Sequence, residues 1–180
     1  MVFLRFLMEN NFSTIDDVPN SLLRNVLLNH VVSEELRYSR FQTGYKKTAA
    51  ISDANGLPLS IYIEQINMRV TLNGQSRITN GNIMASNGII HVVNNVIPIP
   101  SVVTFVEADF NLSSLAQALT REDLTTDFIS VLNTSADTSP APFTVFAPNP
   151  KAFADLLDEL GLQRLSLIDE PTLNSTLTYH

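Results

Sequence analysis

The sequence predicts an α+β protein that consists of two related but incomplete units. The segments Phe6–His30 and Leu156–His180 share one order: an apolar helix-like stretch, an acidic turn with a proline, and a second apolar helix that ends in histidine. Alternating apolar residues between Ala49 and Val93 are typical of strands. A repeat at an offset of 150 residues has the size of a domain rather than of a solenoid unit. The pairs that match at this offset are Leu7 and Leu157, Glu9 and Glu159, Leu23 and Leu173, Leu27 and Leu177, and His30 and His180.

A helical pattern and then a β pattern follow one another in the first half of the chain. Apolar residues at helical spacing predict a helix over residues 21–32, capped by Asn20 or Ser21. Asn-Gly pairs favour hairpin turns because both residues tolerate positive φ, so four such pairs predict an antiparallel meander. We expect Ile89–Val93 to be the last strand, before Pro98. The four pairs are Asn55-Gly56, Asn73-Gly74, Asn80-Gly81 and Asn87-Gly88.

The second half is predicted to begin at Pro98–Ser101, a short boundary that its prolines stiffen. Ser114, with Gln117 three residues later, predicts a capping box for a helix through Leu119. The remaining elements are expected in this order: a helix over Leu124–Leu132, a polar loop over Thr134–Pro142, a short buried strand over Phe143–Phe146, and an amphipathic helix over Lys151–Leu160 that Gly161 ends.

Composition indicates a globular protein that does not bind nucleic acid. Hydrophobic residues make up 44% of the chain and charged residues 16%, which suits a sizeable buried core. The net charge of −7 leaves no basic stripe to neutralise phosphates. The chain has no Cys, which excludes disulfides, thiolate zinc sites and a Cys nucleophile. A loose group of cations is interpreted as a solvated loop and consists of Arg37, Arg40, Lys46 and Lys47.

The apolar segment Met1–Met8 has the pattern of neither a membrane span nor a signal peptide. It is too short to cross a bilayer and contains Arg5. It also lacks the charged, apolar and small-residue order of a signal peptide. Because the repeat places this segment inside a domain, we interpret Met1 as an artificial or internal start. Any export signal or membrane anchor is then expected in flanking sequence.

The motifs of enzymes and cofactor sites are missing from the sequence. The three histidines lack the H-x-x-x-H and H-E-x-x-H spacings of metal sites, and His30 and His180 share one position of the repeat. No G-x-S-x-G, P-loop or dinucleotide motif is present. The acidic pairs Asp16-Asp17 and Asp169-Glu170 lie near a proline where a helix is predicted to start, so capping and the helix dipole explain them. We expect no enzyme, no catalytic residue, no cofactor and no metal site.

Three strings carry a family resemblance. Phe143–Pro148, followed by Ala152-Phe153, resembles the TVFAPT-x-x-AF signature of fasciclin (FAS1) domains. Asn82–Val93, followed by Val96-Ile97-Pro98, is similar to the string that closes such domains. The family's L-L-x-Y-H-V-V helix end has two counterparts, at Asn25–Val32 and at Leu177–His180.

This resemblance implies a FAS1-type fold of class α+β: a twisted antiparallel β-wedge with packed helices, present as two incomplete copies. Residues 1–100 correspond to a FAS1 domain that lacks its N-terminal part. Residues 101–180 correspond to one that lacks its C-terminal part. The two pieces are complementary, so they can assemble within one chain or swap between chains. A fragment of a longer tandem array is the most economical explanation.

The resemblance also implies an adhesion or matrix-binding module of a secreted or cell-surface protein, which contacts proteins or glycans and needs no cofactor. In animal members, an Asp-Ile and a Tyr-His motif are linked to integrin binding. Asn82 stands where the Asp-Ile motif has its acid, so integrin recognition as such is not expected. The residues marked for interaction are Asn82, Ile83, Tyr179, His180 and His30.

A structural role for most motif residues is the stronger expectation. We expect Gly88 in a turn, His30 and His91 bonded to backbone groups, and Phe146 and Phe153 in a core. Two other functions stay open: a small-ligand-binding or hydrolytic domain with a His-containing pocket, and a passive spacer in a repeat array. Four N-glycosylation sequons are present, at Asn11, Asn111, Asn133 and Asn174.

Overall fold

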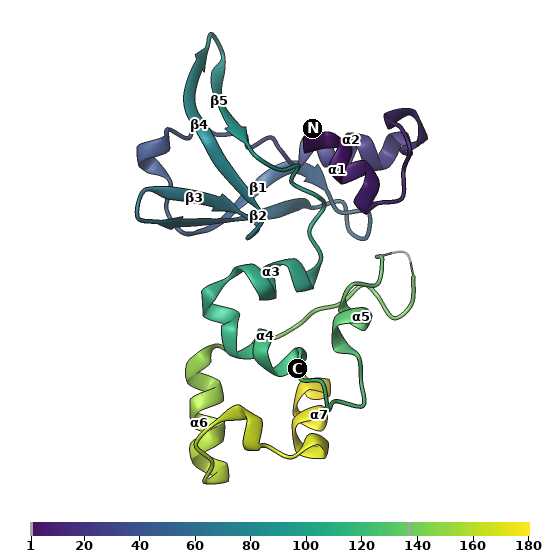
Figure 1. Ribbon diagram of the computed structural model, residues 1–180, viewed down its shortest axis with the longest axis vertical. Helices are drawn as coiled ribbons and strands as arrows, with labels where there is room; N and C mark the ends of the chain where they lie inside the picture. Colours follow the sequence, from purple (N-terminus) through teal and green to yellow (C-terminus); the bar gives the residue numbers. More distant parts are fainter. Residues whose placement is uncertain (1, 137) are drawn as a thin grey trace. The chain divides into compact units, whose positions relative to one another are not determined.

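The computed structural model describes residues 2–136 and 138–180, so the expectations about Met1 and about Asp137 of the predicted loop lie outside the described residues. The chain divides into two compact units, Met1–Pro100 (unit 1) and Ser101–His180 (unit 2). The fold class is α+β, as predicted. The strands of the described residues lie in unit 1, whereas the regular elements described in unit 2 are helices (Figure 1).

Unit 1 contains an antiparallel sheet. Across the part of unit 1 that is described, five strands lie in the order β1-β2-β3-β4-β5, so each strand pairs with the next one in sequence. This arrangement confirms the predicted meander. The strands are β1 (Gly44–Ile51), β2 (Pro58–Ile66), β3 (Arg69–Leu72), β4 (Ser76–Ala85) and β5 (Gly88–Val93).

The Asn-Gly pairs have different roles in the sheet. Asn73-Gly74 joins β3 to β4 with φ values of 48° and 68°, as a hairpin turn requires. Asn80-Gly81 was predicted to be a turn, and this prediction is wrong, because β4 continues through it and pairs with β5 on both sides. The pair lies instead in a bulge, where Asn82 has a φ of 58°. The β2–β3 turn is Asn67-Met68, which sequence analysis did not identify.

Two α-helices and two 3-10 turns accompany the sheet in the described part of unit 1. The helix predicted over residues 21–32 ends earlier, at Leu28. It stops there because the Asn29 side chain turns inward, is fully buried and donates from Nδ2 to the carbonyl O of Pro98 at 2.8 Å. The elements are α1 (Val2–Glu9), η1 (Ile15–Asp17), α2 (Asn20–Leu28) and η2 (Tyr38–Arg40).

The core of unit 1 has a helical part and a sheet part. Burial of apolar side chains on one face of each element excludes water and stabilises the unit. The helical cluster consists of Phe6, Leu7, Val18 and Val26. The sheet cluster consists of Ile61, Ile63, Val70, Leu72, Ile78 and Ile97.

Unit 2 packs its helices around one apolar cluster. Its elements are α3 (Val102–Ala108), η3 (Phe110–Leu112), α4 (Ser113–Leu119), α5 (Phe128–Leu132), α6 (Pro150–Leu160), η4 (Leu165–Leu167) and α7 (Glu170–Tyr179). The cluster consists of Val106, Leu115, Ala118, Leu119, Phe128, Phe153, Ile168, Leu173 and Leu177. Phe153 is 4% exposed, which confirms its predicted place in a core.

Two predicted helix starts in unit 2 are wrong. Ser114 lies inside α4, which begins at Ser113, so Ser114 cannot be its N-cap. The N-cap position is Leu112, whose side chain makes no capping hydrogen bond. A capping box exists at Ser101, whose Oγ accepts from the N–H of Thr104 at 3.3 Å and which starts α3, a helix that sequence analysis missed. The helix predicted from Leu124 begins only at Phe128, because Asp127 caps it by accepting from Ser130 N–H at 3.0 Å.

The strand predicted over Phe143–Phe146 is also absent. The segment is irregular, and Phe146 is 75% exposed rather than part of a core. A strand needs a hydrogen-bonded neighbour, and the described part of unit 2 contains no other strand that supplies one.

The sequence repeat is also a repeat of structure. The order α1-η1-α2 recurs as α6-η4-α7, and both η1 and α2 recur at an offset of 150 residues. The chain turns after the first helix at the same place in both copies, with a left-handed residue: Asn11 has a φ of 59° and Gly161 a φ of 67°. Glycine and asparagine favour this conformation, so both copies end the first helix with a suitable residue.

Candidate functional site

The residues Asn82 and Ile83 lie on a two-stranded arm formed by β4 and β5. Figure 1 shows this hairpin extending away from the rest of the sheet. Large apolar side chains on it face solvent, with exposed fractions of 40% for Ile83, 58% for Met84 and 54% for Ile90. A group of exposed apolar side chains on a projecting hairpin is a candidate contact surface for another molecule.

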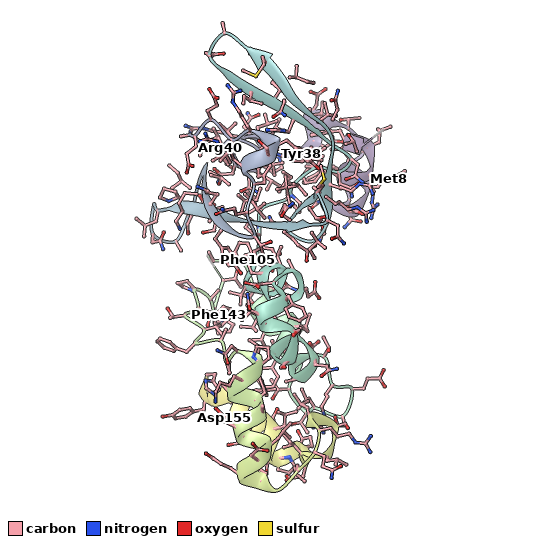
Figure 2. The ribbon with its side chains drawn as sticks, turned by 90° about the vertical axis from the view of Figure 1, so that its left-hand side faces the viewer. Met8, Tyr38, Arg40, Phe105, Phe143 and Asp155 are labelled. Carbon is pink, nitrogen blue, oxygen red and sulfur yellow. The ribbon has the colours of Figure 1, made fainter. Side chains whose placement is uncertain are left out.

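Asn82 itself has a structural role at the base of this arm. Its Oδ1 accepts a hydrogen bond from the backbone N–H of Tyr38 at 2.8 Å, and Tyr38 is labelled in Figure 2. Its own N–H donates to Nδ1 of His91 at 3.4 Å. Asparagine tolerates the positive φ of the bulge better than most residues. The bulge and its contacts therefore account for Asn82, while the neighbouring Ile83 remains available to a partner.

His91 and two aromatic rings pack beneath the bulge. Nε2 of His91 lies 2.7 Å from the carbonyl O of Leu36 and donates to it when Nδ1 accepts from Asn82. Its ring centroid lies 5.2 Å from that of Phe41, and the ring of Tyr38 lies 6.0 Å from Phe41. Backbone groups thus occupy both ring nitrogens of His91, as predicted.

His30 is held in a similar way at the end of α2. Its Nδ1 lies 2.7 Å from the carbonyl O of Val26, and its Nε2 accepts from the N–H of Ile97 at 2.9 Å. A neutral ring with the proton on Nδ1 satisfies both contacts. These contacts join the helix to the segment after the sheet, which is the backbone role predicted for His30.

An apolar groove of about 430 Å³ runs along the sheet of unit 1. Both His30 and His91 border it, and the alternative of a ligand-binding or hydrolytic domain with a His-containing pocket stays a prediction. Its walls come from segments that lie far apart in sequence, which is why sequence analysis did not find it. Apolar lining residues include Val32, Phe41, Ile61, Ile78, Ile89 and Ile90.

Tyr179 and His180 lie at the end of α7 in unit 2. Tyr179 is 90% exposed, and its ring centroid lies 6.1 Å from that of His180. The carbonyl O of His180 accepts a hydrogen bond from the N–H of Phe146 at 3.1 Å. The structure therefore places this motif beside the irregular Phe143–Phe146 segment. Within unit 1, it places His30 and His91 at one groove.

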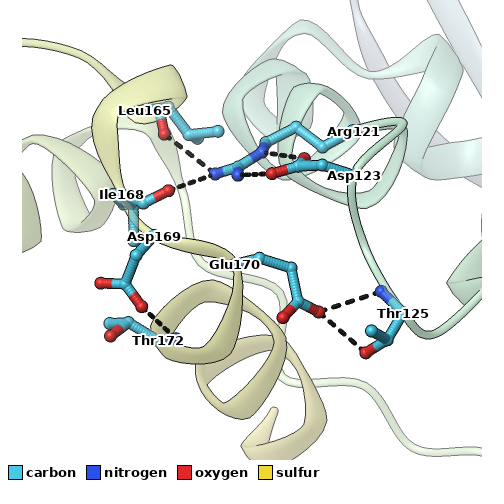
Figure 3. Close-up of polar contacts among 8 residues, drawn as sticks. All are labelled: Arg121, Asp123, Thr125, Leu165, Ile168, Asp169, Glu170 and Thr172. Atoms are coloured by element: carbon cyan, nitrogen blue, oxygen red, sulfur yellow. Dashed lines mark hydrogen bonds and ion pairs between the residues drawn. The ribbon is translucent and has the colours of Figure 1, made fainter.

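A polar cluster around Arg121 lies between the segment after α4 and the η4 turn of unit 2 (Figure 3). Arg121 Nη1 donates to the carbonyl O of Ile168 at 2.8 Å and of Leu165 at 3.3 Å. Its Nε donates to Oδ1 of Asp123 at 2.8 Å, and this hydrogen bond lowers the pKa of Asp123 below its ordinary value. The cluster therefore ties the loop after α4 to η4.

The acidic residues at the start of α7 have structural partners, as predicted. Asp169 caps the helix by accepting from the N–H of Thr172 at 3.0 Å, and that hydrogen bond lowers the pKa of Asp169. Glu170 accepts from the N–H and the hydroxyl of Thr125 at 2.9 and 2.8 Å (Figure 3). These carboxylates thus hold α7 in place.

Across residues 2–136 and 138–180, no three His, Cys, Asp or Glu side chains come together as a metal ion would require. None of the helices described is both long and apolar enough to cross a membrane.

Comparisons with known proteins identify relatives of both units. The family model described as "Fasciclin domain" matches residues 5–100 and, separately, residues 110–180. Human periostin is 28% identical over 163 residues, which cover 89% of this chain and 18% of periostin. A solved FAS1 domain pair from the insect cell adhesion molecule fasciclin I covers 88% of this chain and 52% of its own, with 16% identity and a TM-score of 0.48. The chain thus spans less than a fifth of the length of periostin.

Proposed function

The chain belongs to the fasciclin domain family, and from that premise we propose that it is an adhesion or matrix-binding module of a secreted or cell-surface protein. Fasciclin domains are cell-adhesion and matrix modules. The module binds protein or glycan partners through its surface and needs no cofactor. Unit 1 corresponds to a fasciclin domain without its N-terminal part, and unit 2 to one without its C-terminal part.

The β4–β5 arm is the observation that supports this proposal. Ile83, Met84 and Ile90 are exposed there, although each is an apolar side chain that folding would otherwise bury. Interfaces gain most of their free energy from a few central side chains that become desolvated on binding. The exposed apolar residues of the arm suit this role, with Ile83 next to the bulge that fixes the direction of the arm.

The contacts of the histidines argue against a hydrolytic or metal-dependent function for the groove. A catalytic base or a metal ligand needs a ring nitrogen that is free to contact its target. Backbone groups lie at hydrogen-bond distance from both nitrogens of His30 and of His91. A passive spacer, the other alternative, predicts that the arm binds nothing.

The test is retention of the chain on a surface coated with extracellular-matrix extract, with and without EDTA. We expect the chain to bind under both conditions, and Ile83→Asp or Met84→Asp to weaken binding at least about tenfold. Leu57→Asp is the matched control, because Leu57 is 62% exposed in the same unit but lies in the β1–β2 connection. Treating the coat with protease or with glycosidase identifies the class of partner.

Three results would contradict the proposal. Equal retention of the wild type and the arm variants removes the arm as the contact surface. Loss of binding in EDTA shows a metal requirement. No retention on any coat favours the spacer. Far-UV circular dichroism of each variant confirms that the sheet and helices are retained.

A further inference from the structure

The outer part of the β4–β5 arm is a ribbon of two strands. β3 pairs with β4 at Ser76 and Arg77, whereas the ladder between β4 and β5 continues to the pair of Ala85 and Gly88. Figure 1 shows the end of this ribbon extending away from the rest of the sheet. A two-stranded ribbon is marginally stable on its own, so its end opens at a lower free energy than the interior of the sheet.

One of the four Asn-Gly pairs, Asn87-Gly88, lies at the end of this ribbon. Ser86 and Asn87 form the two-residue turn between Ala85 and Gly88, and Asn87 is exposed. No residue in the described part of the chain hydrogen-bonds to the side chain of Asn87. A Cβ at Gly88 would meet no atom within 4 Å. The Asn87 amide and the peptide bond that follows it therefore have room to rotate.

An Asn-Gly pair can react with itself when this rotation brings the two groups together. The backbone nitrogen of Gly attacks Cγ of Asn, a new N–Cγ bond closes a cyclic imide, and the Cγ–Nδ2 bond breaks. The proton of the attacking nitrogen passes through solvent to the leaving nitrogen, which departs as ammonia. Glycine favours this attack because it has no Cβ to shield the nitrogen.

Water then opens the imide ring at one of its two carbonyl carbons. Addition at Cγ breaks the Cγ–N bond and gives Asp, whereas addition at the main-chain carbon gives isoaspartate, in which the backbone runs through the side chain. In sum, an amide and water become a carboxylate and ammonium. The reaction needs no oxidant, cofactor or enzyme.

Two of the other Asn-Gly pairs lie in backbone that is packed on several sides. Asn73 is 2% exposed, and its Oδ1 accepts from the N–H of Tyr62 at 2.8 Å. Asn80-Gly81 lies within β4, where pairing with β5 on both sides holds the backbone. A Cβ at Gly81 would lie 2.7 Å from a ring carbon of Tyr38, so this ring covers the pair. Neither pair can rotate without disrupting the sheet.

The remaining pair, Asn55-Gly56, is exposed but is held by hydrogen bonds of its turn. Oδ1 of Asn55 accepts from the N–H of Leu57 at 2.9 Å. The N–H of Gly56, which is the attacking nitrogen, donates to the carbonyl O of Ser52 at 2.8 Å. This pair is a matched comparison for Asn87-Gly88, because both Asn residues are exposed and lie in the same unit.

A carboxylate at the end of the arm would change the character of the whole surface. Residues 78–93 contain no Lys, Arg, Asp or Glu. Conversion of Asn87 therefore places a formal charge on an arm that has none, together with the exposed side chains of Ile83 and Met84. An ionised group resists removal from water, so the converted arm is less suited to an apolar contact.

We propose that Asn87-Gly88 is a self-modification site, at which Asn87 converts to Asp and isoaspartate and gives the end of the arm a carboxylate as the protein ages. The structure of the arm selects this pair from four pairs of the same composition. The reaction itself is independent of adhesion, and only its effect on binding rests on the proposed function.

The test is peptide mass mapping of the full chain during incubation at neutral pH and physiological temperature. One digest reads the conversion of all four pairs in the same sample. In the folded chain, we expect Asn87 to convert at least about tenfold faster than Asn55, Asn73 or Asn80. In concentrated urea, where the fold no longer restrains the backbone, we expect the four pairs to convert at similar rates.

Two variants test the assignment of the reacting groups. Asn87→Gln keeps an amide but has a longer side chain that closes a ring more slowly, so position 87 should stay unconverted. Gly88→Ala keeps Asn87 and shields the attacking nitrogen with a Cβ for which the fold has room, so conversion of Asn87 should slow at least about tenfold. Far-UV circular dichroism shows that both variants fold, and both should leave the other three pairs unchanged.

The covalent change alone decides the proposal, so a chain that binds no matrix tests it equally well. Conversion of Asn87 no faster than that of Asn55 in the folded chain would overturn it. Faster conversion of Asn73 or Asn80, or an unchanged rate at Asn87 in the Gly88→Ala chain, would do the same.

Discussion

Asn29 and Tyr179 occupy the same position of the two copies, 150 residues apart, and their environments are opposite. Asn29 is fully buried beside β1 and the segment after β5, where it donates to Pro98 and accepts from Thr48. Tyr179 is 90% exposed. The reverse holds two residues earlier, where Leu27 is 55% exposed and Leu177 is 7% exposed. One helix pair is thus covered by a sheet in unit 1 and by helices in unit 2, and at these two positions each unit exposes the residue that the other buries.

Substitution of Asn29 and Tyr179 should show this difference directly. Asn29→Ala removes buried hydrogen bonds and leaves the carbonyl O of Pro98 without the donor that Asn29 supplies. We therefore expect the free energy of unfolding to fall by about 1–3 kcal/mol. Tyr179→Ala should change it by no more than about 0.5 kcal/mol. Urea unfolding followed by circular dichroism measures both. Equal losses would mean that the two faces are covered alike.

The leucines give the mirror-image prediction. Leu177→Ala opens a cavity in the helical core of unit 2, and we expect it to cost about 2–5 kcal/mol. Leu27→Ala alters a side chain that is more than half exposed, so its effect on the free energy of unfolding should stay below about 1 kcal/mol. Thermal unfolding of the two variants at low protein concentration compares them. A larger effect at Leu27 would contradict the burial pattern.

Gly81 is expected to tolerate no side chain. A Cβ at this position would lie 2.7 Å from a ring carbon of Tyr38 and 3.1 Å from Nδ1 of His91. Tyr38 cannot easily move, because its hydroxyl donates to the carbonyl O of Met68 at 2.9 Å and its N–H donates to Asn82. Gly81→Ala should therefore destabilise unit 1 by about 1–3 kcal/mol, as measured by urea unfolding. Gly88→Ala, with open space around its Cβ, is the control and should be close to neutral.

Acid pH should lower the stability of unit 2 through the carboxylates of Asp123 and Asp169, which Figure 3 shows. The pKa values of Asp123 and Asp169 are lowered in the folded protein. Between these lowered values and the ordinary value of 3.8, the unfolded chain therefore binds more protons than the folded chain. The stability that they contribute is present above the ordinary pKa of 3.8 and is lost as the pH falls through the folded-state values. Asp169→Asn keeps an oxygen acceptor for the helix cap but no titration, so its unfolding should depend less steeply on pH. Unfolding temperatures at a series of acid pH values measure this slope, and an unchanged slope would contradict the assignment.

Arg121 should not be replaceable by lysine. Its guanidinium bonds two carbonyl oxygens and Asp123 at once, a geometry that a single ammonium cannot reproduce. Arg121→Lys is expected to cost about 1–3 kcal/mol of unfolding free energy, measured by urea unfolding. Arg164→Lys is the control, because Arg164 is exposed just before η4, the element that Arg121 contacts, and this substitution should be neutral. A neutral Arg121→Lys would show that the cluster is not needed to hold η4.

Local patterns predicted the parts of the fold that depend on neighbouring residues. The α+β class, the meander and the helix repeat all follow from spacing and from turn residues such as Asn73-Gly74. The errors arose where distant contacts decide. Asn80-Gly81 resembles a turn but is held within β4 by pairing with β5. Phe143–Phe146 has the composition of a strand but has no paired neighbour in unit 2.

The candidate site shows the same division. Sequence analysis correctly predicted that His30 and His91 bond to backbone groups. It could not identify the groove, whose walls join residues near position 30 to residues near position 90. Exposure also cannot be read from residue type: Phe153 is buried and Phe146, in the same motif, is exposed.

Retention of the chain on a surface coated with extracellular-matrix extract tests the proposed adhesion function most directly. The wild type and Leu57→Asp are expected to be retained with and without EDTA, whereas Ile83→Asp is expected to lose at least about tenfold in binding. Equal retention of Ile83→Asp and the wild type, or no retention of either, would contradict the account.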